Sequence, residues 1–117
     1  MLLIGQCIAG RMAFKDGMQS AYWRPYLVIG VDAMRREVSI LNISSTDGKE
    51  HKLLFPTNVA LLNSMPPLAK PSFVKVDSMQ TISFDCASGF DLLSGGALIS
   101  QGDLNAVLDA LGRLEVC

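Results

Sequence analysis

The sequence contains little of what metal centres and disulfide scaffolds are built from, since its 117 residues include three cysteines and one histidine. Cys7, Cys86 and Cys117 are odd in number and far apart, so neither a disulfide framework nor a zinc site with CxxC spacing is indicated. No cluster of carboxylates has the spacing of metal ligands either. We therefore expect no metal, no cofactor, and reduced thiols of the kind found in cytoplasmic proteins.

Long apolar runs are also missing. No stretch reaches the roughly 18 apolar residues that a membrane-spanning helix needs, and the start, MLLIGQCIAG, lacks the basic segment of a secretory signal. Walker A, GxGxxG and G-x-S-x-G motifs do not occur, which argues against a nucleotide cofactor and against a serine hydrolase. We expect no membrane association and a cytoplasmic location.

The sequence does contain enough apolar material for one well-packed domain over residues 1–117. Half of its residues are apolar and 18% are charged, as in a globular domain of this size. The net charge is −1, but residues 1–80 carry nine Lys and Arg against six Asp and Glu, whereas 81–117 carry one against five. The first part is therefore locally basic, which is sufficient for contact with phosphates.

Most of the chain is predicted to form short β-strands, because apolar and polar residues alternate or form short apolar runs between turn residues. The expected strands are 2–9, 24–32, 37–43, 51–55, 72–78 and 81–84. Pro25 is tolerated because it lies at the start of its strand. The glycine-containing segment 10–23 reads as a loop, and the prolines of 64–71 make that segment irregular.

Two helices are expected beside the strands. Thr57 is suited to cap a short helix over 58–63. Ser100 and Asp103 resemble a capping box at the start of an amphipathic helix over 101–114. The apolar face of this helix contains Leu104, Val107, Leu108 and Leu111. The predicted fold is α+β and mainly β: a curled, partly open antiparallel barrel with a short internal helix and a C-terminal amphipathic helix.

Arg24 is the first candidate for chemistry, because it stands at the start of the most apolar strand, between Trp23 and Pro25. In most proteins such an arginine is a surface residue stacked on an aromatic ring. The functional interpretation is a guanidinium held at the end of a rigid strand, where its fork can bind a phosphate at two points. A cation held in this way stabilises a phosphorane-like transition state.

Lys75 and Asp77 form a second candidate group, because residues two apart in a strand lie on the same face. The ordinary interpretation is a solvated ion pair. The functional one is an acid and a base, or a phosphate anchor and its orienting group, on a rigid strand. Gln80 lies close enough in sequence to hydrogen-bond a base edge.

The segment ISSTDGKEH, residues 43–51, connects two apolar runs and contains the only histidine of the chain. Ser44 and Ser45 end a strand, where hydroxyl groups commonly bond to the backbone of a turn. His51 has an unperturbed pKa suited to proton transfer near neutral pH, although a lone histidine beside a turn is more often a surface residue. The segment is either a polar turn or one wall of a site.

Four stretches, in the same order along the chain, resemble the PemK/MazF family of toxins from toxin–antitoxin systems. WRPYLVI resembles the family's Arg-Pro strand, and VSILNISS resembles the next strand, which ends in a Thr or Ser that faces the site. PSFVKVDSMQTIS is similar to the family's central stretch, and SQGDLNAVLDALGRL is similar to its C-terminal helix. The likeness extends over nearly the whole chain, and its specificity comes from order and spacing.

The resemblance implies an SH3-like barrel that forms a homodimer. It also implies a metal-independent endoribonuclease that cleaves single-stranded RNA and is neutralised by an antitoxin. In the corresponding hypothesis, the 2′-OH of RNA attacks its own phosphorus and leaves a 2′,3′-cyclic phosphate and a 5′-OH. This reaction needs a base, an acid and a cation at the phosphorane.

The resemblance assigns catalytic positions to Arg24, Ser44, Lys75 and Asp77. Arg24 would supply the cation and Ser44 a hydrogen bond to a phosphate oxygen, with Asp77 as the base and Lys75 or His51 as the acid. The residues expected to bind RNA are Trp23, Ser45, Lys49, His51, Phe73 and Gln80. Among the aromatic residues, Trp23, Tyr22 and Phe73 are expected to stack on unpaired bases.

Three departures from the family pattern leave a second function open. Lys75 stands where one branch of the family usually has Arg, Gln80 where Arg or Lys is usual, and Gln6 where Asp or Glu is usual. The alternative is a catalytically degenerate module that binds RNA or a protein partner. A topoisomerase poison is disfavoured, because those relatives end in Trp-Gly-Ile and this chain ends in LGRLEVC.

Overall fold

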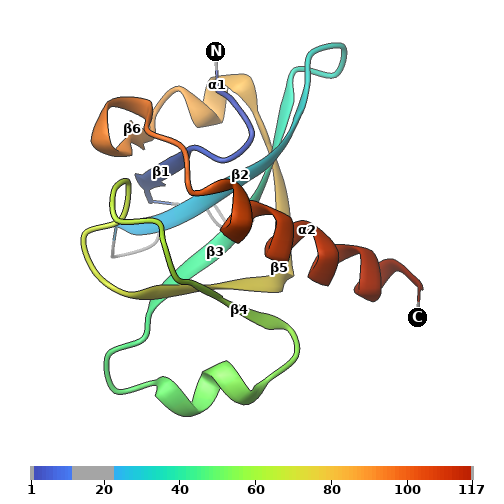
Figure 1. Cartoon of the computed structure of the whole chain (residues 1–117). Coiled ribbons are helices and arrows are strands. Elements are labelled where there is room, and N and C mark those ends of the chain that lie inside the picture. The colour runs from blue at the N-terminus through green and yellow to red at the C-terminus, as the bar shows by residue number, and fades with distance from the viewer. Residues whose placement is uncertain (1, 12–22, 117) are drawn as a thin grey trace.

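The computed structural model describes residues 2–11 and 23–116. These residues form one antiparallel sheet with the strand order β4-β5-β3-β2-β1-β6 (Figure 1). The strands are β1 (Cys7–Gly10), β2 (Arg24–Asp32), β3 (Glu37–Ser45), β4 (Asn58–Leu61), β5 (Ser72–Ser83) and β6 (Asp91–Leu92). The helices are the 3-10 helix η1 (Glu50–Leu54), α1 (Phe84–Ala87), the 3-10 helix η2 (Leu93–Gly96) and α2 (Gln101–Val116).

The predicted class, α+β and mainly β, is confirmed, but the sheet is not closed into a barrel. β4 and β6 form its two edges, and no strand pairing joins them in the described part of the chain. β4 has four residues and β6 has two, so both edges expose few unpaired backbone groups. The expected SH3-like barrel is therefore an open sheet covered on one face by α2 (Figure 1).

The central pair of strands agrees best with the sequence prediction. β2 has the predicted bounds, and β3 extends the predicted strand by two residues, to Ser45. A tight turn joins them, in which Asp32 Oδ1 accepts hydrogen bonds from the backbone N–H groups of Met34 and Arg35, both at 3.1 Å. This strand pair holds the start of β2 and the end of β3 side by side.

Two short elements differ from the prediction. Residues 51–55, expected as a strand, belong mainly to η1, which turns through i to i+3 hydrogen bonds such as Phe55 N to Lys52 O at 3.2 Å. Residues 58–63, expected as a helix, contain β4, which pairs with β5. A short apolar run such as NVALL suits a helix or a strand equally, so pairing with a neighbouring strand decides its structure.

The predicted strands 72–78 and 81–84 are one continuous strand, β5, with a bulge inside it. Asn42 of β3 pairs with Lys75, whereas Ile40 pairs with Gln80, so extra residues of β5 lie between the two pairs. Ser78 Oγ accepts a hydrogen bond from Asn42 N at 2.9 Å and donates one to Lys75 O at 2.6 Å. Its hydroxyl replaces ladder bonds that the bulge removes.

The first strand is shorter than predicted, because β1 begins at Cys7 and not at residue 2. The residues before it form a turn in which Gly5 has a φ of 98°, a conformation that favours glycine. Gly5 N donates to Val28 O at 2.9 Å. The turn therefore joins the beginning of the chain to β2 without extending the strand.

The sheet separates two apolar clusters. The cluster on the α2 side includes Cys7, Leu27, Leu41, Val74, Val76, Val107 and Leu111. The cluster on the other face includes Ile8, Tyr26, Val28, Val38, Ile40 and Ile82. The predicted apolar face of α2 needs one correction: Leu108 is 43% exposed, while Ala110 is buried. The buried side of the helix is therefore rotated relative to the predicted one.

Candidate functional site

A pocket of about 510 Å³ opens where β2 begins and β3 ends, and it brings Arg24 and Ser44 together. Its wall comes from three separate parts of the chain and from two single residues. The lining residues are Trp23, Arg24 and Pro25 at the start of β2, Ile43, Ser44 and Ser45 in β3, Pro67, Leu68, Ala69 and Lys70 in the segment before β5, and Ser72 and Leu93.

Arg24 is held at the pocket by a strand that is paired on both sides. It lies opposite Gly10 of β1, and β3 flanks β2 on the other side. Its side chain is exposed. Tyr26, two residues further along the same face, is buried; burial raises the pKa of its phenol, and the Arg24 charge acts against this rise. The guanidinium therefore lies close to the phenol and to the pocket.

Ser44 faces the same pocket from β3, and Lys49 joins it from the following turn. Lys49 Nζ donates a hydrogen bond to Ser44 Oγ at 3.2 Å, although Lys49 itself does not line the pocket. Ser45 Oγ accepts from Asp47 N at 3.2 Å, the local bond expected of a hydroxyl at a turn. The segment 43–51 is thus a turn and a pocket wall at once.

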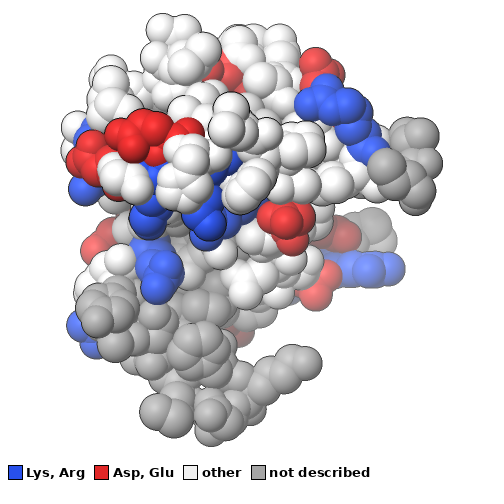
Figure 2. Space-filling model, turned by 90° about the horizontal axis from the view of Figure 1, so that it is seen from below, with Lys and Arg blue, Asp and Glu red and all other residues white. Residues whose placement is uncertain are grey.

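The described residues that line this pocket have cations and hydroxyl groups but no carboxylate. Arg24 and Lys70 supply the charge, and Ser44, Ser45 and Ser72 supply hydroxyl groups. Figure 2 shows that several Lys and Arg side chains gather on the side of the molecule that is seen from below, with Asp and Glu side chains beside them. A wall of this composition suits an anion such as a phosphate.

Lys75 lies on the same sheet face as Arg24 and Ser44 but does not line their pocket. Asn42 pairs with both Lys75 and Tyr26, and residues two apart in a strand share a face. Lys75 is half-buried. The Oδ1 atom of Asn42, which lies between Tyr26 and Lys75 on the same face, is buried with no hydrogen-bond partner among the described residues.

Asp77 and Gln80 are exposed on β5 and lie outside the pocket. Asp77 falls within the bulge and has no paired partner in β3, and Gln80, at the end of the bulge, pairs with Ile40. The structure therefore brings Arg24 and Ser44 together, and leaves Asp77 and Gln80 further along the sheet.

Of the residues expected to bind bases, Phe73 needs a correction. Its side chain has 0% exposure, although its partner on the neighbouring strand is Ser44, so it offers no ring to a base. Trp23 is 52% exposed and lines the pocket. His51 is exposed in η1 and does not line the pocket. Tyr22 and most of the expected loop over 10–23 lie outside the described residues.

The sequence prediction missed Lys70, which lines the pocket from the proline-containing segment 64–71. The only signal in the sequence was a single lysine in an otherwise uncharged segment. Gln6, which stands where the resembled family usually has Asp or Glu, has a structural role. Its Oε1 accepts from Leu3 N at 2.8 Å, and its Nε2 donates to Gly96 O at 3.2 Å.

Within the described residues, no group of three or more His, Cys, Asp or Glu side chains is placed to hold a metal ion. None of the described helices is both long and apolar enough to cross a membrane. Cys7 is buried, which raises the pKa of its thiol to about 12, whereas Cys86 is exposed.

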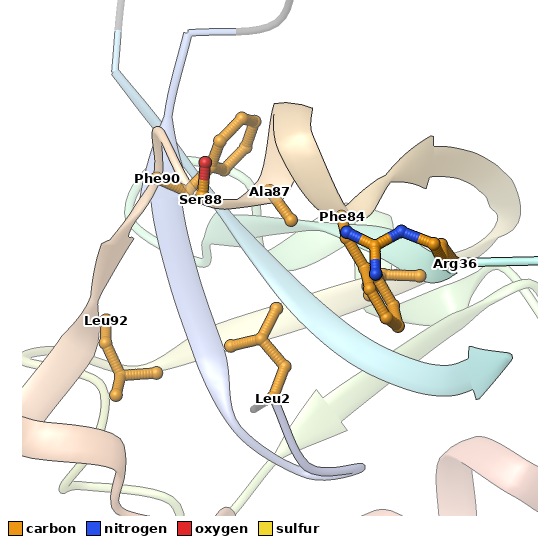
Figure 3. Close-up of a pocket in the computed structure, with 8 residues that line it drawn as sticks. Leu2, Arg36, Phe84, Ala87, Ser88, Phe90 and Leu92 are labelled. Carbon is orange, nitrogen blue, oxygen red and sulfur yellow. The ribbon is translucent and has the colours of Figure 1, made fainter. Parts of the chain in front are cut away.

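A second cavity, also of about 510 Å³, lies beside α1 and β6 (Figure 3). Its lining is mainly apolar and consists of Leu2, Arg36, Val38, Phe84, Ala87, Ser88, Phe90 and Leu92. The Arg36 guanidinium lies over the Phe84 ring, 5.4 Å from its centroid. The cavity contains none of the residues that the sequence indicated, so we do not assign the candidate site to it.

The fold and the pocket together define a small, mainly β protein with an open antiparallel sheet and a cationic pocket at the start of β2. No known protein family's sequence profile matches this chain, and no curated protein matches it. Solved structures of MazF do match it in fold.

A structure of MazE-MazF (Form-II) from Deinococcus radiodurans has a TM-score of 0.68 and 17% identity, covering 97% of this chain and 94% of that one. A structure of MazF (Form-I) from the same organism has a TM-score of 0.67 and 17% identity, and it covers the same shares of the two chains. A structure of MazE-MazF (Form-III) from the same organism has a TM-score of 0.58 and 19% identity, covering 80% of this chain and 85% of that one. The chain therefore has a MazF-like fold, as the sequence resemblance implied.

Proposed function

We propose that this chain is the toxin of a toxin–antitoxin pair and that it cleaves single-stranded RNA without a metal ion. The observation that carries the proposal is the meeting of Arg24 and Ser44 in one cationic pocket, on neighbouring strands of a MazF-like fold. An arginine on a rigid strand is suited to hold a phosphate and to stabilise the charge that develops on it.

In the proposed reaction, the 2′-OH of a ribose loses its proton to a base and attacks the adjacent phosphorus. The bond from phosphorus to the 5′ oxygen breaks, and that oxygen takes a proton from an acid, which leaves a 2′,3′-cyclic phosphate and a 5′-OH. Arg24 stabilises the phosphorane and Ser44 hydrogen-bonds one of its oxygens. Asp77 is the proposed base and Lys75 or His51 the proposed acid.

The arrangement supports Lys75 more than His51 as the acid. Neither residue lines the pocket, but Lys75 shares a sheet face with Arg24 and Ser44, whereas His51 lies in η1. Trp23, Ser45 and Lys49 are the proposed RNA contacts beside the scissile phosphate. Gln80 is further away along β5 and would contact RNA only beyond the pocket.

The proposed partners are an antitoxin and a second copy of the chain. Two of the matching structures are described as MazE-MazF, which supports a protein partner for this fold. An antitoxin tail that is acidic and partly apolar would complement the cationic pocket and block Arg24. The mean hydropathy of +0.33 supports a homodimer that covers apolar surface.

Replacing Arg24 tests the proposed activity. We expect the wild-type protein to cleave a mixed-sequence single-stranded RNA in the presence of EDTA. Arg24→Ala should lower the cleavage rate by about 10²-fold or more, the usual effect of removing one group that stabilises developing charge. Arg35→Ala is the matched control, because Arg35 lies in the β2–β3 turn, pairs with Asp32 at 3.9 Å and does not line the pocket. Equal rates for the two variants would contradict the role of Arg24.

A binding module without catalysis is the second candidate. It is favoured by the position of Asp77 and Gln80 outside the pocket and by Lys75 in place of arginine. Stable binding of RNA by the wild type, with no product after prolonged incubation, would support this candidate and contradict the nuclease.

A further inference from the structure

We propose that Lys70 forms a second phosphate subsite in the pocket, and that Asp103 positions it by tying the segment 62–71 to the start of α2. The inference rests on the proposed function, because it takes the ligand to be an RNA backbone. Arg24 would bind the scissile phosphate, and Lys70 would bind a neighbouring phosphodiester on the opposite wall.

Two hydrogen bonds hold the backbone at Lys70 and Pro71 in place. Ser72 Oγ donates to Lys70 O at 2.9 Å, and Thr46 N donates to Pro71 O at 3.1 Å. These bonds connect the segment to the start of β5 and to the residue after β3. The ammonium of Lys70 is exposed and forms no ion pair with a carboxylate in the described part of the chain, so its charge is available to a ligand.

The other end of this segment is held by a buried carboxylate. Asp103, in the first turn of α2, is 5% exposed. Its Oδ1 accepts from Leu62 N at 3.1 Å, and its Oδ2 accepts from Asn63 N at 2.9 Å and from Ser64 Oγ at 2.5 Å. We call these four residues the Asp103 clasp. Three hydrogen bonds to one ionised group fix the turn that begins the pocket wall.

The segment between the clasp and Lys70 has further supports. Leu68 N donates to Ser64 O at 2.9 Å, which closes a turn within the segment. Ser94 Oγ donates to Pro67 O at 3.1 Å. The side chain of Leu68 is buried in the cluster that also contains α2 residues. The pocket wall is therefore joined to α2 at the clasp and through the core, so α2 controls where Lys70 lies relative to Arg24.

Binding of an uncleavable RNA separates this inference from catalysis. The probe is a short single-stranded RNA with 2′-O-methyl groups, which lacks the attacking hydroxyl. Its affinity is measured by fluorescence anisotropy over a series of salt concentrations. Lys70→Ala should weaken binding and reduce the slope of log K against log salt by about 0.7, the value for one phosphate contact on a single strand.

Lys52→Ala is the matched control, since Lys52 lies in η1 with its ammonium over the Phe55 ring, 5.6 Å from the centroid. We expect the slope for this variant to equal that of the wild type. An equal loss of slope in both lysine variants would mean a diffuse basic face and would overturn the subsite.

The positioning role of Asp103 is tested by combining variants. Asp103→Asn should weaken binding of the probe in the wild-type background and have no further effect in Lys70→Ala, because both changes remove the same contact. A merely structural role would weaken binding by the same factor in both backgrounds and would overturn the positioning role. If Asp103→Asn does not fold, Ser64→Ala removes a single bond of the clasp and is tested in the same way.

The outcomes also distinguish this inference from the proposed function. A wild-type protein that binds the probe, with Lys70→Ala unchanged, overturns the subsite and leaves the nuclease standing. Binding that depends on Lys70, without cleavage of unmodified RNA, supports the subsite and overturns the nuclease. A wild-type protein that does not bind the probe overturns both.

Discussion

Asp103 illustrates how one residue acquires a role that its local sequence does not reveal. In the sequence it completes a capping-box pattern with Ser100, and Ser100 Oγ does accept from Asp103 N at 3.1 Å. Its carboxylate, however, bonds to residues 62–64, about 40 positions away. Burial alone raises its pKa, but the hydrogen bonds from Ser64 and the neighbouring backbone outweigh burial and lower the pKa below the usual value.

This lowered pKa predicts how stability depends on pH. A carboxyl group with a lower pKa in the folded state stabilises the fold fully above its unfolded pKa, and this contribution is lost as the pH falls through the folded pKa. At pH 7, Asp103→Asn should lower the free energy of unfolding by about 1–3 kcal/mol, and the difference should shrink below about pH 4. Urea denaturation at pH 7 and pH 3 measures both values. A difference that is independent of pH would contradict the prediction.

At the level of single residues, strand position indicates which side chains lie near one another. Arg24 and Ser44 were expected to face one site, and both line the same pocket. Phe73 was expected to stack on bases, but its side chain is buried, with an exposure of 0%. Alternation specifies which residues share a face, but the neighbours that cover this face come from distant parts of the chain.

At the scale of elements, α2 shows what helical periodicity can and cannot define. The helix begins after the predicted cap and has an apolar side, as expected. The side that packs on the sheet contains Val107, Ala110 and Leu111, with Leu108 turned outward. Several adjacent apolar residues make the apolar side of α2 broad, so the part of it that becomes buried depends on the sheet surface that the helix contacts.

Two leucines of α2 test this packing. Leu111 is 8% exposed and Leu108 is 43% exposed. We predict that Leu111→Ala lowers the free energy of unfolding by about 2–5 kcal/mol, because it leaves a cavity in the core. Leu108→Ala should change it by less than about 1 kcal/mol. Guanidinium denaturation of both variants measures the difference. Similar losses in the two variants would contradict the assigned face.

At the scale of the whole molecule, the exposed apolar side chains support the proposed homodimer. Leu54, Leu62 and Met65 are exposed by 83%, 75% and 52%, and all three lie near the β4 edge of the sheet. We predict that sedimentation analysis at micromolar concentration yields about twice the chain mass of 12.6 kDa, since association covers apolar surface. A mass equal to one chain over the whole concentration range would contradict the dimer.

The sequence by itself determined the class of fold, the bounds of β2, the irregular segment before β5 and the cap of α2. These depend on local rules: the position of proline, short apolar runs and capping residues. Arg24 and Ser44 could be expected to lie near each other because each stands at the end of a strand that the sequence defines.

Only the tertiary structure decided the rest. Pairing with β5 made a strand of residues 58–61, where helix and strand were equally compatible with the local sequence. The bulge placed Lys75 opposite Asn42 and Gln80 opposite Ile40, and the Asp103 clasp joined residues 62–64 to the start of α2. Each of these depends on hydrogen bonds between residues distant in the chain. Such bonds form only when the whole sheet and α2 are in place, so no local pattern could have predicted them.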